Sequence, residues 1–399
     1  MSELPAAFLT YGWCRVSYVI VHSLARRGVA VHVGDASRLA MCRYSRHHAS
    51  FSRYRNPYRD PDGFITDVAE AMQRTGAQVL IPGHEDILVI ARLRDRFPKN
   101  ILIPVVEADR IAATINKWTV CDLARRAKVP VPETFKPETR EELIEKSNAL
   151  SYPAVVKTQL GNSGKGVFIV ESADDCLKRF DWLVETYKLD SHHWPIVQAF
   201  APGAGFGVCL LYNRGECRAA FVERYLRCKE GKFGTSVFRE SVCVPALEEY
   251  ARSLMDSLKW HGVVHLDFHY DEASRRAALI EINPRFWGAL DLAVRAGVDF
   301  PWLLYRMAVD GDVEPVTAYQ TGVRSRWIVG EMIHLFNLAR RGRVIQAART
   351  IKDILANHSD GCDDFRVTDP LPLLAEMLYY GSGFLTTGST NPIEEGMIG

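Results

Sequence analysis

The first hundred residues alternate between short apolar runs and longer stretches with helical spacing of their apolar positions. Runs of this length are typical of buried strands, and the longer stretches are typical of amphipathic helices. In chain order we predict a strand at 6–11, a helix at 13–27, a strand at 29–33, a helix at 62–75, a strand at 79–81, a helix at 86–97 and a strand at 101–105. Strands that alternate with helices form a parallel sheet covered by helices. The pattern therefore predicts a doubly wound α/β domain at residues 1–110.

The turn after the first predicted strand, 10–15, reads Thr-Tyr-Gly-Trp-Cys-Arg. A dinucleotide-binding turn needs the three glycines of G-x-G-x-x-G, and this turn contains only Gly12. Asp35, after the second predicted strand, is more typical of a helix cap or a turn than of a ribose ligand. We therefore expect no NAD site in this domain.

The pattern changes after residue 110. Helices are predicted at 116–127 and 138–150, on either side of a segment that contains Pro130 and Pro132. Polar turns then separate a series of strands, which indicates a mostly antiparallel sheet with interspersed helices. The predicted strands are 154–157, 167–171, 196–200, 208–212, 219–225, 263–270 and 277–283.

Residues from 301 onward read as largely helical, and the basic stretch 339–343 reads as a solvated helix end. The tail, 381–399, is rich in Gly, Ser and Thr, so we expect it to be loosely structured. These shifts predict four parts, at 1–110, 111–195, 196–312 and 313–399.

Composition narrows the class of protein. With 47% apolar and 24% charged residues the chain is globular, which excludes a disordered or collagen-like protein. The net charge of +1 provides no basic field for non-specific nucleic-acid binding. No apolar run reaches the roughly 18 residues that would suggest a membrane span. The nine cysteines are scattered without a C-x-x-C pair, which fits reduced thiols, and we expect a cytoplasmic protein.

A glycine-rich segment joins two of the predicted strands. Residues 158–166 contain Gly161, Gly164 and Gly166, and the backbone N–H groups of such a loop can close over phosphates. The segment fails the Walker spacing and no helix follows it, so a plain hairpin is the alternative. Lys157 ends the apolar strand before the loop, where its natural partner is a phosphate or a base nitrogen.

Two predicted strands carry the most informative polar residues. Side chains two positions apart on a strand lie on the same face. The turn at 271–275 is short enough to join the two strands as a hairpin. The polar faces that would then meet comprise His265, Asp267 and His269 on the first strand and Glu281, Asn283 and Arg285 on the second.

Asp267, Glu281 and Asn283 would together offer two carboxylates and an amide oxygen. Such hard oxygen ligands suit Mg²⁺ that bridges nucleotide phosphates better than they suit zinc. Arg285 beside them suits a phosphate or a carboxylate. Two alternatives stay open on the residues alone: a solvated polar sheet face, and a transition-metal site that uses His265 and His269.

The lysine strand, the glycine loop and the segment 279–288 (Leu-Ile-Glu-Ile-Asn-Pro-Arg-Phe-Trp-Gly) together resemble the ATP-grasp superfamily, and in particular its carboxylate–amine ligase branch. Residues 260–263 (Trp-His-Gly-Val) are similar to that branch as well. The resemblance covers about residues 5–310 and follows the family's order of motifs. It implies an ATP-grasp fold of α/β and α+β parts, with a Rossmann-like domain in front and a helical C-terminal region behind.

The resemblance also implies a role for each residue that matches a family motif. The implied nucleotide-binding residues are Lys117, Lys157, Gly161, Ser163, Gly164, Gly166, and the hinge residues Gln198, Ala199 and Phe200, whose backbone would meet the adenine edge. The implied ligands of two Mg²⁺ ions, which Mn²⁺ could replace, are Asp267, Glu281 and Asn283. The implied catalytic residues are Arg285, Lys157 and Arg224.

The sequence departs from the family pattern at two places. Ala199 stands where the hinge usually carries an acid, and residues 204–207 offer no acid for the ribose hydroxyls, so ribose recognition is unassigned. Lys232 and the run 234–236 (Gly-Thr-Ser) resemble the G-G-x-S segment near the acceptor pocket, but Phe233 replaces its first glycine.

The activity that the resemblance implies is ATP-dependent ligation. A small carboxylate would become an acyl phosphate with release of ADP, and an amine would then displace phosphate. A carboxylase that uses bicarbonate, a non-catalytic nucleotide-binding protein and a kinase-like phosphotransferase are the alternatives. The implied partners are small-molecule substrates, with no nucleic acid and no membrane, and a homodimer is compatible with the sequence.

Overall fold

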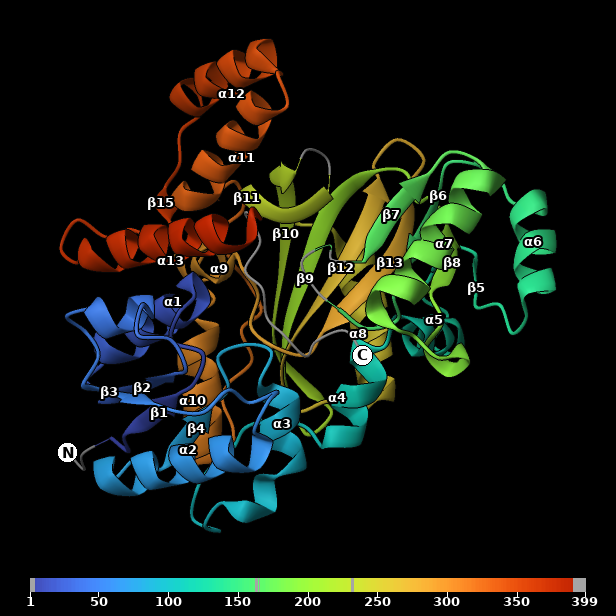
Figure 1. The fold of residues 1–399 in the computed structure, drawn as a ribbon. Helices are drawn as coiled ribbons and strands as arrows, with labels where there is room; N and C mark the ends of the chain where they lie inside the picture. The colour runs from blue at the N-terminus through green and yellow to red at the C-terminus, as the bar shows by residue number, and fades with distance from the viewer. Residues whose placement is uncertain (1–3, 162–163, 165, 231–232, 390–399) are drawn as a thin grey trace.

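The computed structural model describes residues 4–389, apart from 162–163, 165 and 231–232 (Figure 1). The N-terminal domain is built on a parallel sheet of four strands in the order β3-β2-β1-β4. Its elements are β1 (Ala7–Leu9), α1 (Arg15–Ala25), β2 (Val31–Asp35), β3 (Ser50–Arg53), α2 (Pro61–Thr75), β4 (Val79–Ile81) and α3 (Ile87–Arg92). The predicted α/β fold of this region is thereby confirmed.

Details of this domain differ from the predicted elements. The strand β3 was not predicted, because its residues are polar and partly exposed at the sheet edge. The helix expected at 86–97 breaks after α3 into a short 3₁₀ helix, Arg94–Arg96. The strand expected at 101–105 is reduced to one bridge between Val79 and Leu102, since Pro104 has no N–H to donate to a ladder.

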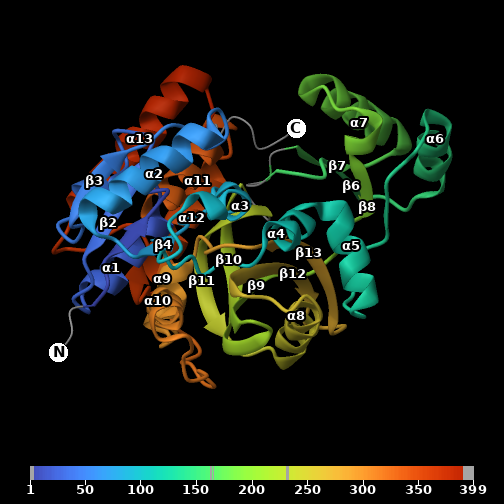
Figure 2. The same ribbon diagram turned by 90° about the horizontal axis from the view of Figure 1, so that it is seen from below.

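A smaller antiparallel sheet forms a separate lobe that carries its own helices (Figure 2). Its strand order is β5-β8-β6-β7. The elements of this part are α4 (Ala108–Ile115), α5 (Lys117–Arg126), β5 (Thr134–Phe135), α6 (Arg140–Ala149), β6 (Ala154–Lys157), β7 (Val167–Val170), α7 (Ala173–Tyr187) and β8 (Ile196–Ala199). Asn116 caps α5 by accepting from the N–H groups of Trp118 and Thr119, which puts Lys117 at the first position of that helix.

The large sheet has seven strands in the order β13-β12-β9-β10-β11-β14-β15. Its elements are β9 (Ala204–Asn213), β10 (Glu216–Glu230), β11 (Phe233–Val242), α8 (Pro245–Ser257), β12 (Gly262–Asp271), β13 (Arg276–Asn283), β14 (Arg324–Arg326) and β15 (Gly361–Cys362). The strands β9 to β13 pair antiparallel, as predicted. The strands β14 and β15 come from the region predicted to be helical, and they extend the sheet at one edge.

The two faces of the large sheet differ in chemistry. On one face Leu266 and Phe268 of β12 join a buried apolar cluster with residues of α8 and α5. On the other face Asp267 and His265 point into a cavity. The alternation predicted from the sequence is therefore confirmed for β12. It buries one face in the apolar core and directs the other toward the cavity.

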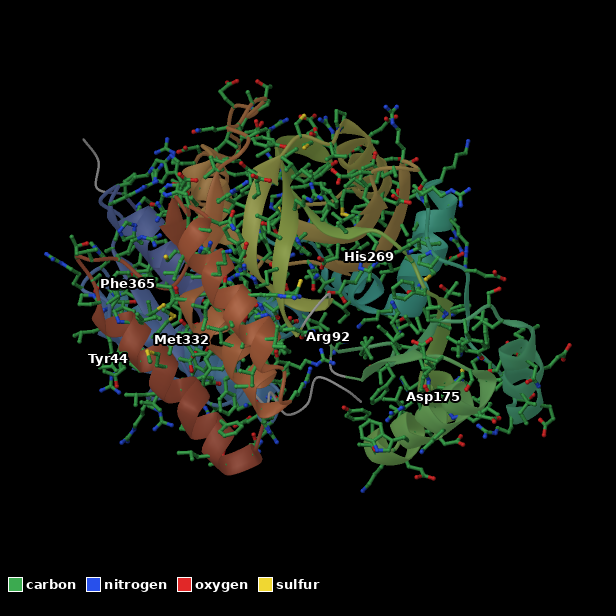
Figure 3. All side chains as sticks on the ribbon, turned by 90° about the horizontal axis from the view of Figure 1, so that it is seen from above. Tyr44, Arg92, Asp175, His269, Met332 and Phe365 are labelled. Atoms are coloured by element: carbon green, nitrogen blue, oxygen red, sulfur yellow. The ribbon has the colours of Figure 1, made fainter. Side chains whose placement is uncertain are left out.

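The C-terminal region packs against both the N-terminal domain and the large sheet (Figure 1). Its helices are α9 (Leu290–Arg295), α10 (Phe300–Asp310), α11 (Ile328–Arg340), α12 (Val344–Ala356) and α13 (Leu371–Thr387). The view in Figure 3 shows Met332 of α11 and Asp175 of α7 on opposite sides of the molecule, with His269 of β12 between them. Within the described residues, no helix combines the length and the apolar character needed to cross a lipid bilayer.

The prediction of a loose tail from residue 381 was wrong for its first part. Helix α13 continues to Thr387, and Gly388 ends it in the left-handed conformation with φ 68°. The Gly and Ser residues of this segment suggested a coil, but Phe384 within it packs edge-on against Phe336 of α11, with ring centroids 5.3 Å apart. Tertiary contacts of this kind stabilise a helix more than local propensity does. Residues 390–399 lie outside the described part of the chain.

Candidate functional site

A cavity of about 560 Å³ lies where the N-terminal domain, the small sheet, the large sheet and the C-terminal region meet. Most of the predicted site residues line it. They are Lys117, Lys157, Gly161, Gly164, Gln198, Ala199, Phe200, Asp267, Glu281, Asn283 and Arg285. The fold therefore brings together residues that the sequence separates by more than a hundred positions.

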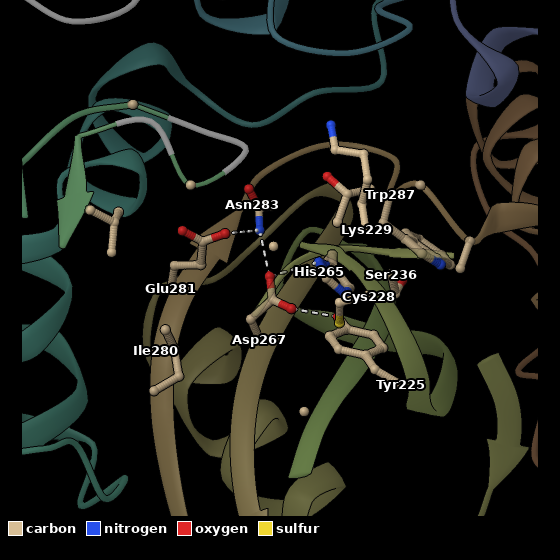
Figure 4. A pocket seen from close by; sticks show the side chains of 18 of the residues that line it. Tyr225, Cys228, Lys229, Ser236, His265, Asp267, Ile280, Glu281, Asn283 and Trp287 are labelled. Atoms are coloured by element: carbon tan, nitrogen blue, oxygen red, sulfur yellow. Dashed lines mark hydrogen bonds and ion pairs between the residues drawn. The ribbon is translucent and has the colours of Figure 1, made fainter. Parts of the chain in front are cut away.

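The predicted metal ligands lie at the junction of β12 and β13 (Figure 4). Asp267 and Glu281 are direct partners in the strand register, which is one of the arrangements that the predicted hairpin allows. The Asn283 Nδ2 group donates to Asp267 Oδ2 at 3.0 Å and to Glu281 Oε1 at 3.2 Å. Two carboxylates and an amide are thus in mutual contact on one patch of the cavity wall.

The electrostatics of this patch fit a divalent cation. Burial and the neighbouring Glu281 carboxylate raise the pKa of Asp267. Two neighbouring, half-buried carboxylates repel each other, and a hard cation between their oxygens would remove that cost. The Asn283 amide nitrogen faces both carboxylates here, so coordination by its oxygen requires the amide to turn over.

Two lysines approach the cavity from the small lobe. Lys157 is 3% exposed, and its Nζ donates to Gln198 Oε1 at 2.8 Å. Burial, and then the charge of Lys117, lower the pKa of Lys157 to about 8. The Lys117 Nζ donates to the Gly161 carbonyl at 2.6 Å, and burial lowers its pKa as well. Desolvated ammonium groups of this kind gain strongly from an incoming phosphate.

The glycine loop has the backbone conformation that requires glycine. Gly161, Gly164 and Gly166 have φ values of 120°, 74° and 66°. At Gly166 a Cβ atom would also lie 2.7 Å from the Thr158 hydroxyl oxygen. Gly161 and Gly164 line the cavity, whereas the predicted contact at Ser163 lies outside the described residues. The loop therefore differs from a plain hairpin, because it borders the cavity next to Lys117 and Lys157.

At the hinge, the structure gives Gln198 a role that sequence reasoning missed. The backbone of this residue was predicted to meet adenine, but its side chain is buried and holds Lys157, while its Nε2 donates to Thr134 Oγ1 at 2.8 Å. Ala199 and Phe200 line the cavity. The Ala199 N–H donates to the Glu133 carbonyl at 2.8 Å, so it is engaged within the protein.

Arg285 is held from two sides next to the patch of Asp267, Glu281 and Asn283. Its Nη2 donates to Asn283 Oδ1 at 3.1 Å, and its Nε donates to Glu85 Oε1 at 2.7 Å. Glu85 follows β4, so this contact joins the N-terminal domain to the large sheet. Sequence reasoning missed Glu85, although the carboxyl end of a parallel strand is a usual place for ligand-binding residues.

Arg224 is not among the residues that line the cavity. Its neighbours on β10, Glu223 and Tyr225, do line it, so the alternation of the strand turns Arg224 to the other face. There it pairs with Glu272 at 2.9 Å and lies over the Phe206 ring. We therefore do not retain the predicted catalytic role of Arg224.

The predicted acceptor segment is only partly described. Residues 234–236 line the cavity, and Lys232 lies outside the described residues. Lys229 of β10 also lines the cavity and was not predicted. Its position on a long strand that continues past residue 225 explains why the shorter predicted strand missed it.

The two histidines considered for a transition metal do not share a ligand set. His269 Nδ1 lies 2.8 Å from the Ala201 carbonyl oxygen. His265 instead lies with Cys209 and Glu223 in a buried group whose potential ligand atoms are within 4.8 Å of one another. Burial, and then the nearby charge of Arg285, lower the pKa of His265 to about 3, so it is neutral there.

Comparison with known proteins identifies this architecture. A family described as ATP-grasp in the biosynthetic pathway with Ter operon matches residues 195–331. Among solved structures, the biotin carboxylase domain of Hydrogenobacter thermophilus 2-oxoglutarate carboxylase, in complex with MgADP and bicarbonate, superposes with a TM-score of 0.64 at 14% identity, over 80% of this chain and 73% of that chain. The chain therefore has the ATP-grasp fold, as its motifs predicted, and its residues 195–331 match a family of ATP-grasp proteins.

Curated relatives match shorter regions. The chain is 22% identical to urea amidolyase of Lachancea kluyveri over 282 residues, which are 65% of this chain and 15% of that protein. It is 32% identical to mouse N-acetylaspartylglutamate synthase A over 143 residues, which are 33% of this chain and 34% of that protein. The match therefore spans about a seventh of the first relative and a third of the second.

Proposed function

We propose that this protein is an ATP-dependent ligase that activates a small carboxylate as an acyl phosphate and joins it to an amine. The observation that carries the proposal is the convergence of Asp267, Glu281 and Asn283 with Lys157 and Arg285 on one cavity. An acid patch for Mg²⁺ and flanking cations for phosphates are what phosphoryl transfer from ATP requires. The identity to mouse N-acetylaspartylglutamate synthase A supports a ligase that forms an amide bond.

Each side chain has a defined task in this reaction. Asp267, Glu281 and Asn283 would hold Mg²⁺, which neutralises charge on the β- and γ-phosphates when bound. Lys157 and Lys117 bind the phosphates from the side of the glycine loop. Arg285, fixed by Glu85, neutralises the negative charge on the phosphoryl group during its transfer.

The proposed chemistry proceeds in two displacements. A carboxylate oxygen attacks the γ-phosphorus, the bond to the β–γ bridging oxygen breaks, and ADP leaves. The amine nitrogen then attacks the acyl carbon, the carbon–oxygen bond to phosphate breaks, and the amine loses a proton to solvent. The protein therefore needs to position the substrates and to neutralise the phosphate charges, and it needs no strong base.

A carboxylase that uses bicarbonate is the second candidate. The likeness to a biotin carboxylase domain solved with MgADP and bicarbonate favours it, because bicarbonate can take the place of the carboxylate without changing the phosphate machinery. The two candidates separate when ADP release is measured with bicarbonate alone and with a panel of carboxylates and amines, with the product identified by its mass.

Substitution of Glu281 tests the proposal. E281A should abolish ADP formation while the circular dichroism spectrum stays native, because the side chain lies on the cavity wall and not in the apolar core. E272A, in the exposed turn of the same hairpin, is the matched control and should keep activity. Full turnover by E281A would refute the metal assignment.

The homodimer, the use of Mn²⁺ and the cytoplasmic location stay predictions.

A further inference from the structure

The cavity has an end that the proposed chemistry does not use. There it is lined by Trp13 and Arg15 of the N-terminal domain, Trp287 of the loop after β13, and Trp327 and Tyr380 of the C-terminal region. We name these five residues the aromatic end. They come from both ends of the chain, so the C-terminal region contributes directly to the cavity wall.

The aromatic side chains of this end are held in fixed positions. Trp13 stacks on Tyr379 with ring centroids 4.6 Å apart, and Tyr380 lies at 6.2 Å from Trp13 and 5.7 Å from Trp327. The Trp327 Nε1 donates to the buried Glu376 carboxylate at 3.1 Å. A preorganised wall of flat rings favours a flat apolar ligand, since little side-chain freedom remains to be lost on binding.

Arg15 brings a cation to the same wall. It is 6% exposed, and its guanidinium lies over the Trp327 ring at 3.8 Å. Its Nε donates to the Gly288 carbonyl at 3.1 Å and lies 3.4 Å from Asp363, a carboxylate that also pairs with Arg239 at 2.7 Å. The two terminal amino groups of Arg15 donate no hydrogen bond to any residue that the structure describes.

Trp287 supplies a second, independent observation at this end of the cavity. It is 1% exposed, lines the cavity, and follows Phe286 in the loop that carries Gly288. Its Nε1 has no hydrogen-bond partner among the described residues. A buried donor without a partner costs free energy, and an acceptor on a bound molecule would remove that cost. Arg15 and Trp287 therefore both offer unused donors at one end of the cavity.

The chemistry of the proposed reaction decides which substrate lies there. The activated carboxylate must reach the γ-phosphate, so it belongs near Asp267, Glu281 and Arg285. A second anion held at the aromatic end is therefore a carboxylate that is not activated. That carboxylate fits the amine substrate, because the amine must face the acyl phosphate while the rest of the molecule extends away from the metal patch.

We propose that the amine substrate is an aromatic amino acid, with its carboxylate on Arg15 and Trp287 Nε1 and its ring against Trp13 and Tyr380. The proposal rests on the proposed ligase function, since it takes the metal patch as the place of carboxylate activation. A guanidinium can bind a carboxylate through two parallel hydrogen bonds, which gives this end both affinity and orientation.

The experiment measures binding rather than turnover. Calorimetric titrations in saturating MgADP would compare L-phenylalanine with phenethylamine, which keeps the ring and lacks the carboxylate, and with L-leucine, which keeps the carboxylate and lacks the ring. We expect phenylalanine to bind at least tenfold more tightly than either. In R15Q, the affinity for phenylalanine should fall to that for phenethylamine, while the affinity for phenethylamine stays unchanged. In Y380A the preference for phenylalanine over leucine should be lost.

Controls keep this test separate from the nucleotide site. W182L, a substitution of an exposed tryptophan on α7, should change none of these affinities. MgADP affinity should be unchanged in R15Q and Y380A; if R15Q does not fold, R15K, which keeps the charge and loses the fork, takes its place. No phenylalanine binding to a protein that binds MgADP, or equal binding of phenylalanine and leucine, would overturn this inference and leave the ligase proposal standing. Failure to bind MgADP would overturn both.

Discussion

Asp267 and Glu281 stand directly opposite each other across β12 and β13, with the Asn283 amide touching both carboxylates. Without a cation the pair is repulsive, so E281Q should stabilise the metal-free protein and raise its melting temperature by about 1–3 °C. Scanning calorimetry with and without Mg²⁺ and ATP checks this. The wild type should gain stability from the metal nucleotide and E281Q should not, and an equal gain in both would contradict the assignment.

The hydroxyl of Tyr225 on β10 donates to Asp267 Oδ1, and it orients that carboxylate from behind. Y225F should raise the Mg²⁺ concentration needed for half-maximal ADP formation about tenfold, with the rate at saturating Mg²⁺ largely kept. Titration of activity against Mg²⁺ measures this. Y212F removes a similar Tyr–Asp contact, to Asp256 at 2.6 Å on the other face of the sheet, and should leave the Mg²⁺ dependence as it is.

The buried ammonium of Lys157 predicts a pH dependence of nucleotide binding. Burial lowers its pKa from 10.5 to about 8 in the free protein, so the cation is present below pH 8 and is lost as the pH rises above that value. Because phosphate binds the cation, MgADP affinity should be constant from pH 6.5 to 7.5 and fall up to tenfold per unit above about pH 8. Calorimetry across this range measures it. K157R, which stays charged, should bind more weakly and with a flat profile, and a flat wild-type profile would disprove the role of Lys157.

Glu85 fixes Arg285 from the N-terminal domain at 2.7 Å. E85Q should lower kcat about tenfold and leave the KM for ATP within twofold, because a misplaced guanidinium weakens the transition state more than the ground state. Steady-state kinetics separate the two parameters. D62N removes the exposed ion pair of Asp62 with Arg96 in the same domain and should alter neither. A change confined to KM would show that Arg285 only binds substrate.

Much of the site could be predicted because its residues follow local rules. The period of two along β12 predicts that His265 and Asp267 share a face, and the short turn after the strand predicts that this face lies near Glu281 and Asn283. The register shift between Asp267 and Phe268, which sets Asp267 directly opposite Glu281, had no signal in the sequence. The glycine loop could be predicted as well, because three glycines close together between two strands indicate a backbone with positive φ angles.

The parts that were missed depend on contacts between distant segments. Domain packing brings Trp327 and Tyr380 to the cavity and Glu85 to Arg285, and neither periodicity nor spacing provides a signal for it. Arg224 is the opposite case, a residue that was predicted in the site and lies outside it. A motif match placed it in the site, although Glu223 beside it on the same strand already occupied the cavity face.

The course of the chain gives this site an order of assembly during synthesis. Tyr379 and Tyr380 of α13 close over Trp13, which is made more than 360 residues earlier. On a translating ribosome the N-terminal domain, the lysines and the acid patch can all form before α13 has left the exit tunnel. On the proposed assignments, the nascent protein would complete the phosphate-binding part of the cavity first and the aromatic end last.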